Sequence, residues 1–366
     1  MVLTILAALL GSFILSCVGT FTIRALARRR GFVDRPGGHK EHDAPIALGG
    51  GIAITWAVCL PVMIATVAAC AAVRFGVPDW CPELIKTHIG GVAFKAPAVF
   101  AIIGGALILH VVGLIDDARP LGAAPKFIAQ FAVALILSTM FGIRVMELLP
   151  TWISVSITVL WIVLITNAFN FLDNVDGLSA GVAAIAGTIF AVSALSGGQI
   201  FVPVAMLMLV GALLGFLIFN FPPATIFMGD AGSMVVGYLM AVFIILTTFY
   251  DPDTALKPAG IFLPIVVLAV PLYDVVTVSI HRIRAGASIF RGDRRHFSHR
   301  LIQRGFSQRA AVLTIYLATA ATSLAGIVLP HCDWPAACLI FAQCLCVVLL
   351  IAILEHTPGL RPKVES

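Results

Sequence analysis

Charged residues are scarce in this chain. Asp, Glu, Lys and Arg make up 11% of its 366 residues, whereas roughly a quarter is usual in a soluble globular domain. Hydrophobic residues make up 60% of the sequence, and the mean hydropathy is +1.05. This composition excludes an ordinary soluble domain and predicts a protein that crosses a lipid bilayer several times.

Cysteine pairs with metal-binding spacing are absent as well. None of the eight cysteines forms a CxxC pair or a zinc-type Cys/His pattern. Six of them lie within apolar stretches, where a free cysteine behaves as a small hydrophobic side chain. Cys81 and Cys332 fall in expected outer loops and could form a disulfide in an oxidising compartment.

Long apolar stretches are what the chain has in quantity. Eleven of them are close to the ~20 residues that a helix needs to cross ~30 Å of hydrocarbon. They predict an all-α, polytopic membrane protein that forms a single domain over residues 1–366. The stretches are 2–23, 47–73, 97–115, 127–143, 152–170, 178–197, 200–219, 233–250, 260–280, 310–330 and 334–354.

The basic residues predict the orientation of these helices. No Lys or Arg precedes the first stretch, which is too long for a signal-peptide core, so we expect an uncleaved helix. Of the 23 Lys and Arg residues, 18 fall on one side, in 24–46, 116–126, 281–309 and the tail after 354. Because cytoplasmic loops are enriched in Lys and Arg, the N-terminus is expected outside and the C-terminus in the cytoplasm. The net charge of +5 therefore needs no nucleic-acid partner.

Polar residues gather on the same expected inner face. Taken singly, each cluster has an ordinary interpretation, such as helix capping by Asp230 or hydrogen bonding between helices through Asn167, Asn170 and Asn174. Their concentration on one face predicts an active site at the inner membrane interface. The segments are "DRPGGHKEHDAPIALGGG" (34–51), "DDARPLGAAPK" (116–126), "NAFNFLDNVDGLSAG" (167–181), "NFPPATIFMGDAGS" (220–233) and "HRIRAGASIFRGDRRHFSHRLIQRG" (281–305).

These residue types suit chemistry on phosphates. Carboxylate and amide oxygens are typical Mg²⁺ ligands, and Mg²⁺ can neutralise and orient a diphosphate. Arg and Lys side chains from the last inner loop can bind phosphate oxygens. An acceptor phosphate carried by a lipid would explain why the site lies at the ends of membrane helices.

Five motifs, in order and on one side, carry a resemblance to a known family. They are "DRPGGHKEHDAPIALGGG", "DDARPLGAAPK", "NAFNFLDNVDGLSAG", "FMGDAGS" and "DRRHFSHRL". Over essentially its whole length the chain resembles the polyprenyl-phosphate N-acetylhexosamine-1-phosphate transferases. The resemblance implies transfer of a sugar-1-phosphate from a UDP-sugar to undecaprenyl phosphate, with release of UMP and with Mg²⁺ (or Mn²⁺) as cofactor.

The resemblance also implies a setting for this reaction. The active site would lie on the cytoplasmic face of the inner (plasma) membrane, and the segment 281–309 would complete it. The product would start a cell-envelope glycan such as lipopolysaccharide or teichoic acid. The partners would be the UDP-sugar, undecaprenyl phosphate and the lipid bilayer, and the protein could form a homodimer.

Roles for individual residues follow from the same resemblance. It implies that catalysis depends on Asp116, Asp117, Lys126 and His296. It implies Mg²⁺ ligands at Asn170 and Asp230. It implies that the donor is bound by Lys40, Asn167, Asp173, Asp176, Phe227, Arg294, Arg295 and His299. Within this set, Asp173 and Asp176 would line the uridine pocket, and Phe227 would stack on uracil.

The sugar and the protein class leave alternatives. The motif "DRRHFSHRL", followed by "IQRGFS", and the eleven crossings resemble the branch of the family that transfers GlcNAc-1-phosphate more than the phospho-MurNAc-pentapeptide transferases. Relatives in the GlcNAc branch often have a third histidine where this chain has Ser298, so the phospho-MurNAc-pentapeptide transferases remain an alternative. If 296–300 is helical, Ser298 points away from His296, and we expect a histidine there to be tolerated. A secondary transporter is a further alternative, because His110 and Asp274 lie within apolar stretches. The sequence shows no internal repeat that would support it.

Overall fold

The computed structural model describes residues 2–35, 44–79, 81–250, 255–286 and 296–356. The described chain is almost entirely helical, with one short antiparallel hairpin. Its strands are β1 (Val33–Asp34) and β2 (Ile46–Ala47), and its 3₁₀ helices are η1 (Pro258–Phe262) and η2 (Leu329–His331). Its α-helices are α1 (Val2–Arg30), α2 (Gly50–Phe75), α3 (Glu83–Ala118), α4 (Ala123–Met140), α5 (Thr151–Leu172), α6 (Leu178–Ser196), α7 (Phe201–Asn220), α8 (Asp230–Ile245), α9 (Leu263–Val267), α10 (Ala269–Arg284), α11 (Phe297–Gln303), α12 (Gln308–Gly326) and α13 (Trp334–His356).

These helices confirm an all-α polytopic membrane protein. Within the described ranges, nine helices are long and apolar enough to cross a membrane, or ten if Pro258–Val267 and Ala269–Arg284 form one span with a 60° bend. The bend has a local cause, since Pro271 has no N–H to donate to the carbonyl of Val267. The remaining expected span, 233–250, corresponds to α8. That helix has 16 residues, which gives about 24 Å at 1.5 Å per residue.

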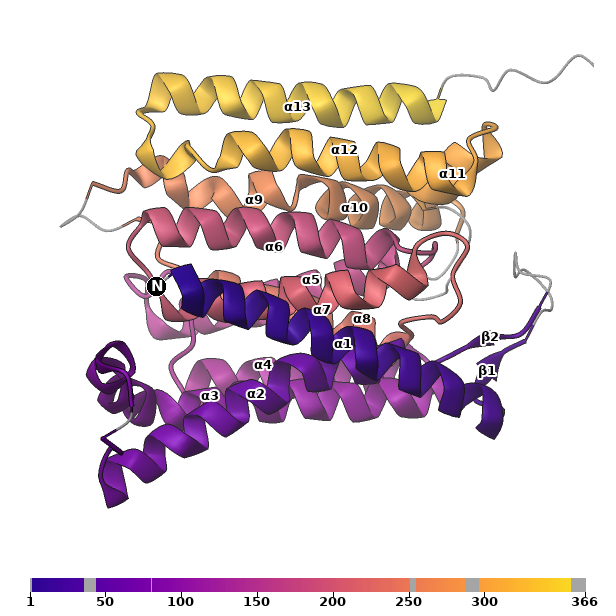
Figure 1. The fold of residues 1–366 in the computed structure, drawn as a ribbon. Helices are drawn as coiled ribbons and strands as arrows, with labels where there is room; N and C mark the ends of the chain where they lie inside the picture. Colours follow the sequence, from indigo (N-terminus) through magenta and orange to yellow (C-terminus); the bar gives the residue numbers. More distant parts are fainter. Residues whose placement is uncertain (1, 36–43, 80, 251–254, 287–295, 357–366) are drawn as a thin grey trace, which may run out of the picture.

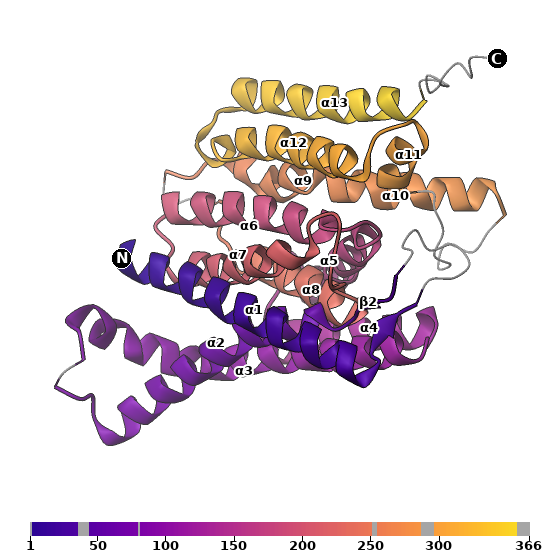
Figure 2. The same ribbon diagram turned by 45° about the vertical axis from the view of Figure 1, so that its right-hand side comes forward.

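α8 lies in the protein core. Every residue from Ala231 to Ile244 is buried, so its length need not match the hydrocarbon thickness. In Figure 1, α12 and α13 form one side of the bundle and α2, α3 and α4 form the other, with α5 to α8 between them. Figures 1 and 2 show the start of α1 and the end of α13 at opposite ends of the bundle, as an odd number of crossings requires.

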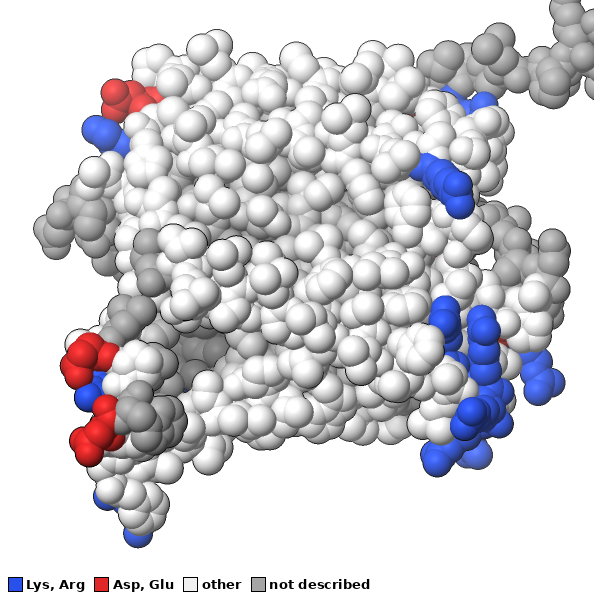
Figure 3. All heavy atoms as spheres, in the orientation of Figure 1, with Lys and Arg blue, Asp and Glu red and all other residues white. Residues whose placement is uncertain are grey.

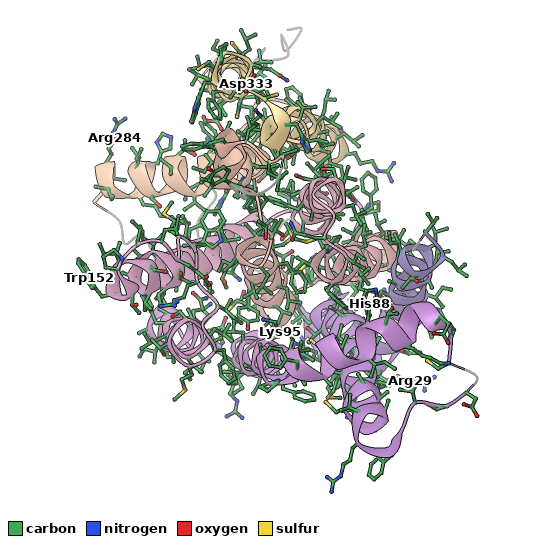
Figure 4. All side chains as sticks on the ribbon, turned by 90° about the vertical axis from the view of Figure 1, so that its left-hand side faces the viewer. Arg29, His88, Lys95, Trp152, Arg284 and Asp333 are labelled. Atoms are coloured by element: carbon green, nitrogen blue, oxygen red, sulfur yellow. The ribbon has the colours of Figure 1, made fainter. Side chains whose placement is uncertain are left out.

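The two ends of the bundle differ in charge. Lys and Arg gather where α1 ends and the hairpin lies, whereas the opposite end shows the acidic groups and few basic ones (Figure 3). Viewed along the helices, α10 leaves the bundle and ends at Arg284, and the first turns of α3, with His88 and Lys95, cross the end nearest the viewer (Figure 4). Which end faces the cytoplasm stays a prediction. All eight cysteines are free thiols, so the structure does not contain the suggested pair of Cys81 and Cys332.

Candidate active site

Close backbone contacts place the start of α8 at the basic end of the bundle. The N–H groups of Gly50 and Gly51 donate to the carbonyls of Phe227 and Met228 at 2.9 and 3.0 Å. A side chain at Gly51 or at Gly113 would clash with the backbone of α8 around Ala231. Two glycines on α2 and α3 therefore allow both helices to pack directly against the first turn of α8.

Asp117 at the end of α3 caps this first turn. Its Oδ1 accepts from the N–H of Asp230 at 2.8 Å, and its Oδ2 accepts from the N–H of Ala231 at 3.2 Å. These N–H groups have no partner within their own helix, and the helix dipole favours a negative charge at this point. Gly229, with φ of +73°, lies against the carboxylate, and a Cβ there would clash with it. Asp117 and Asp230, both expected at the centre, are thus fixed to each other.

Lys126 joins Asp230 to Asp116, the remaining acid of the expected centre. Its Nζ donates to Asp230 Oδ2 at 2.7 Å and to Asp116 Oδ2 at 3.1 Å. Asp116 also accepts from the N–H of Leu121 at 2.8 Å, which closes the turn between α3 and α4. All three charged groups are partly buried. The structure therefore brings together residues that are 104 and 114 positions apart in the sequence.

Asn170, one expected metal ligand, lies beside Asp230, the other. Its Nδ2 donates to Asp230 Oδ1 at 3.0 Å and to Ser233 Oγ at 2.9 Å. The nitrogen and oxygen of an amide are assigned by hydrogen bonding, and a bound cation would reverse the assignment and turn Oδ1 toward the carboxylate. Ser233 was not expected here, although its position three residues after Asp230 places both on one helical face.

Asp173 lies close to three other carboxylates of this site. Burial, followed by the nearby charges of Asp230, Asp117 and Asp176, raises the pKa of Asp173 well above its usual range, although an N–H bond from Gly229 opposes the shift. Among the described residues, no group of three His, Cys, Asp or Glu side chains is arranged to hold a metal ion. A cation here would need mixed carboxylate, amide and water oxygens, which is the ligand set of Mg²⁺.

The loop between α1 and α2, which the sequence predicts on the inner side, lies against the segment before α8. The N–H of Phe227 donates to the carbonyl of Ala47 at 2.8 Å, and Ala47 pairs with Ile226 in a parallel bridge. Asp176 Oδ2 accepts from the N–H of Ala224 at 2.9 Å and holds the same segment from the other side. The expected uracil contact of Phe227 therefore involves a residue fixed between two loops at the basic end of the bundle, and the contact itself stays a prediction.

His296 belongs to a second cluster next to the first. It precedes α11, and its Nδ1 lies 2.8 Å from Asp274 Oδ2. Its ring meets the edge of Phe171 at 5.7 Å between centroids, and the Arg282 guanidinium lies over Phe171 at 5.1 Å. Because Phe171 follows Asn170 in α5, the two clusters are adjacent in the chain. Asp274 and Arg282 were not expected in this role.

The expected face of 296–300 is partly wrong. His296 lies before the first helical turn, in extended backbone, so the helical geometry assumed for it does not apply. Ser298 is buried and donates to Asn174 Oδ1 at 2.6 Å. Contrary to the expectation, a histidine at this position would displace a contact between α11 and the end of α5. His299 is buried on the same short helix.

The other expected donor-binding residues divide into two groups. The Asn167 amide lies inside the bundle, where Nδ2 donates to Gln130 Oε1 at 2.6 Å and to the carbonyl of Val163 at 2.7 Å. It joins α4 to α5, as in the ordinary interpretation of such amides, and its contact with the donor stays a prediction. Lys40, Arg294 and Arg295 lie outside the described residues.

Both ionisable residues that suggested a transporter support this site. His110 Nδ1 lies 2.9 Å from the carbonyl of Ala231 and 3.3 Å from Thr55 Oγ1, so it holds the first turn of α8 from α3. Asp274 pairs with His296. Both side chains therefore bind other groups of the protein, which removes the main argument that they bind a transported ion.

Comparisons with known proteins point to one family. The model of glycosyl transferase family 4 matches residues 99–248. The probable undecaprenyl-phosphate N-acetylglucosaminyl 1-phosphate transferase of Bacillus subtilis (strain 168) is 32% identical over 97% of this chain and 92% of its own. The decaprenyl-phosphate N-acetylglucosaminephosphotransferase of Mycobacterium tuberculosis (strain ATCC 25618 / H37Rv) is 33% identical over 83% and 77%. The undecaprenyl-phosphate alpha-N-acetylglucosaminyl 1-phosphate transferase of Escherichia coli (strain K12) is 26% identical over 89% and 84%.

Proposed function

Because the chain belongs to glycosyl transferase family 4, we propose that it transfers N-acetylglucosamine-1-phosphate from UDP-N-acetylglucosamine to undecaprenyl phosphate and releases UMP. In net terms, a P–O bond forms between the acceptor phosphate and the sugar-bearing phosphorus, and the bridging P–O bond to UMP breaks. The observation that carries the proposal is the cluster of Asp116, Asp117, Lys126, Asn170 and Asp230 at one end of the helices.

The charge of this cluster fits a divalent cation. A donor diphosphate brings negative charge to a place where burial and three neighbouring carboxylates already raise the pKa of Asp173. A hard cation held by Asp230 and Asn170 would offset this repulsion, and Mg²⁺ suits their oxygen atoms. When bound, such an ion neutralises the diphosphate and stabilises the leaving phosphate of UMP.

The side chains of the chain itself would position the two substrates. The Lys126 ammonium lies between two carboxylates and can turn one N–H to a phosphate oxygen in a charge-assisted hydrogen bond. Asp117 holds the first turn of α8 and thereby fixes the place of Asp230. Preorganised charges of this kind contribute to catalysis because they need no rearrangement during the reaction.

The place of the cluster in the fold suits a lipid acceptor. It lies where the spanning helix α3 ends and α4 begins, and on the face drawn in Figure 3 that end also carries most of the Lys and Arg. An undecaprenyl chain could remain in hydrocarbon while its phosphate reaches the site at the interface. By the positive-inside rule we assign this end to the cytoplasmic face of the inner membrane.

GlcNAc is preferred over the phospho-MurNAc-pentapeptide alternative on one specific ground. The three relatives described above are all named for N-acetylglucosamine transfer. No comparable observation favours transfer of a MurNAc-pentapeptide phosphate.

A direct assay tests the proposal. Purified protein is incubated with undecaprenyl phosphate, Mg²⁺ and, in separate reactions, UDP-GlcNAc, UDP-GalNAc, UDP-glucose and UDP-MurNAc-pentapeptide, and both the lipid product and the nucleotide are identified. We expect a GlcNAc-diphospho lipid with an equal amount of UMP, and no product in excess chelator. Release of UDP, full activity in chelator, or selective use of UDP-MurNAc-pentapeptide would contradict it. An Asp230→Asn protein prepared in parallel controls for contaminating host enzymes.

A further inference from the structure

Asp274 is a buried carboxylate that lies outside the cluster around Asp230. It belongs to α10, a helix of the bent pair, and its exposed fraction is 1%. A charged group in such surroundings is costly unless it is paired and hydrogen-bonded. Its contacts therefore indicate why an acid occupies this position.

Both oxygens of Asp274 bind the start of α11. Oδ2 lies 2.8 Å from His296 Nδ1, and Oδ1 accepts from the N–H of Phe297 at 2.8 Å. A carboxylate can only accept, so the proton of this contact belongs to Nδ1 of the imidazole. The second ring nitrogen, Nε2, is directed to the other side, where Arg282 Nη2 lies 3.5 Å away.

Other contacts hold the imidazole in this orientation. Its ring meets Phe171 at an interplanar angle of 73°, and the Arg282 side chain covers the same phenylalanine. These three residues come from α5, α10 and the segment before α11. A rotation of His296 would thus break the bond to Asp274 and disturb the packing of two helices.

We propose that Asp274 is a positioning residue for the transfer reaction, because it holds His296 in one orientation, with the proton on Nδ1 and with Nε2 on the side of Arg282. This inference rests on the proposed function for the substrates of the site. A carboxylate that orients a histidine in this way determines which ring nitrogen can donate to or accept from a substrate. It acts through His296 and needs no contact with the donor or the acceptor.

The chain offers a matched control in Glu355. This acid, at the end of α13, is also buried, with an exposed fraction of 2%, and it also binds α11, where Arg300 Nη2 donates to its Oε1 at 2.9 Å. No contact joins Glu355 to His296 among those of the described residues. A loss that comes only from loosening α11 should therefore appear equally in Glu355→Gln.

The first test is a double-mutant cycle on the transfer activity. Asp274→Asn keeps the size of the side chain but offers one accepting oxygen in place of two. We expect kcat to fall by ~10²-fold, the scale of a lost proton-transfer group, with little change in KM for the UDP-sugar. In a His296→Ala background, Asp274→Asn should have almost no further effect, whereas Glu355→Gln should lower activity by the same factor in both backgrounds. Equal effects of Asp274→Asn in both backgrounds would overturn the proposal.

The second test does not depend on activity. Hydrogen–deuterium exchange of the whole protein in nanodiscs is followed at the Phe297 amide, which Asp274 binds. We expect lost protection at Phe297 in Asp274→Ser and unchanged protection there in Glu355→Gln. Unchanged protection in Asp274→Ser would overturn the positioning role. If the parent protein transfers no sugar but Asp274→Ser still loses protection at Phe297, only the proposed function is refuted, and the contact between Asp274 and α11 stands. If Asp274→Ser does not fold, the cycle with Asp274→Asn still decides.

Discussion

At the scale of single residues, the acids of the site hold helices in place as well as supplying the charge that the proposed reaction needs. Asp117 binds two backbone N–H groups of α8, and the Asp230 carboxylate is shared by Lys126 and Asn170. The sequence placed these residues on one face but could not show which of them touch. Their contacts depend on the packing of α3, α4, α5 and α8, which local patterns do not encode.

The first prediction concerns Asp230. We expect the turnover of Asp230→Asn to fall by at least ~10²-fold, because a group that stabilises bound or developing charge typically contributes this much to the rate. The protein should still fold, since the side chain is partly exposed at the end of the bundle. Steady-state transfer assays and thermal unfolding measure the two effects. The control is Asp333→Asn, an exposed acid of the opposite end that pairs with Lys257, and near-normal turnover of Asp230→Asn would remove this residue from the site.

The second prediction concerns the pH dependence of stability through Asp173. Burial and neighbouring acids raise the pKa of Asp173 in the folded protein. Its contribution to the free energy of unfolding is therefore fully present below the unfolded-state pKa of about 3.9, and it is lost as pH rises through the folded-state pKa. Asparagine carries no charge and avoids this loss. In chelator, the Tm advantage of Asp173→Asn over the parent should therefore grow from pH 5 to pH 8. An advantage that is the same at both pH values would contradict the electrostatic account.

At the scale of elements, the apolar stretches predicted most helices but not their ends. The stretch 97–115 is the apolar part of α3, which begins at Glu83 because polar residues such as Lys86 and Lys95 extend the helix beyond the hydrocarbon. The 60° bend before α10 depends on Pro271, whose effect needs a helix on both sides of it. The glycines at 49–51 were visible as a motif, but their contact with α8 joins segments about 180 residues apart, which only the fold reveals.

The third prediction tests the close approach of α3 to α8. Gly113→Ala would place a Cβ against the backbone of Asp230 and Ala231, so the first turn of α8 would have to shift away from Asp117. We expect a lower Tm and a loss of turnover. Gly104→Ala in the same helix is the control, because a Cβ there meets nothing within 4 Å and alanine favours the helix by about 1 kcal/mol. If both variants behave alike, the contact is not what requires glycine at position 113.

At the scale of the whole molecule, a shared active site requires that the five segments expected on the inner side all lie at one end of the bundle. The described parts of these segments do lie at the end where Figure 3 shows most Lys and Arg, and the hairpin joins two of them directly. The count of crossings depends on α8, whose 16 residues are too few for an ordinary span. The start of α1 and the end of α13 lie at opposite ends of the bundle (Figure 1). The number of crossings must therefore be odd, which requires that α8 also runs from one end of the bundle to the other.

The last prediction uses the two sides of α8. Reporter fusions after Ala224 and after Pro258 flank this helix, and fusions after Gly122 and Glu147 flank α4, which is an ordinary span by length and composition. We expect Gly122 and Ala224 to report the cytoplasm and Glu147 and Pro258 to report the outside, because the basic end of the bundle should face inward.

If Ala224 and Pro258 report the same side while Gly122 and Glu147 differ, α8 does not cross. The end of α13 would then lie on the same side as the start of α1, and the segments after α8 could not share a face with Asp117 and Lys126. A full reversal of all four reporters would keep the shared site intact but would move it to the outer face, where a cytoplasmic UDP-sugar could not reach it.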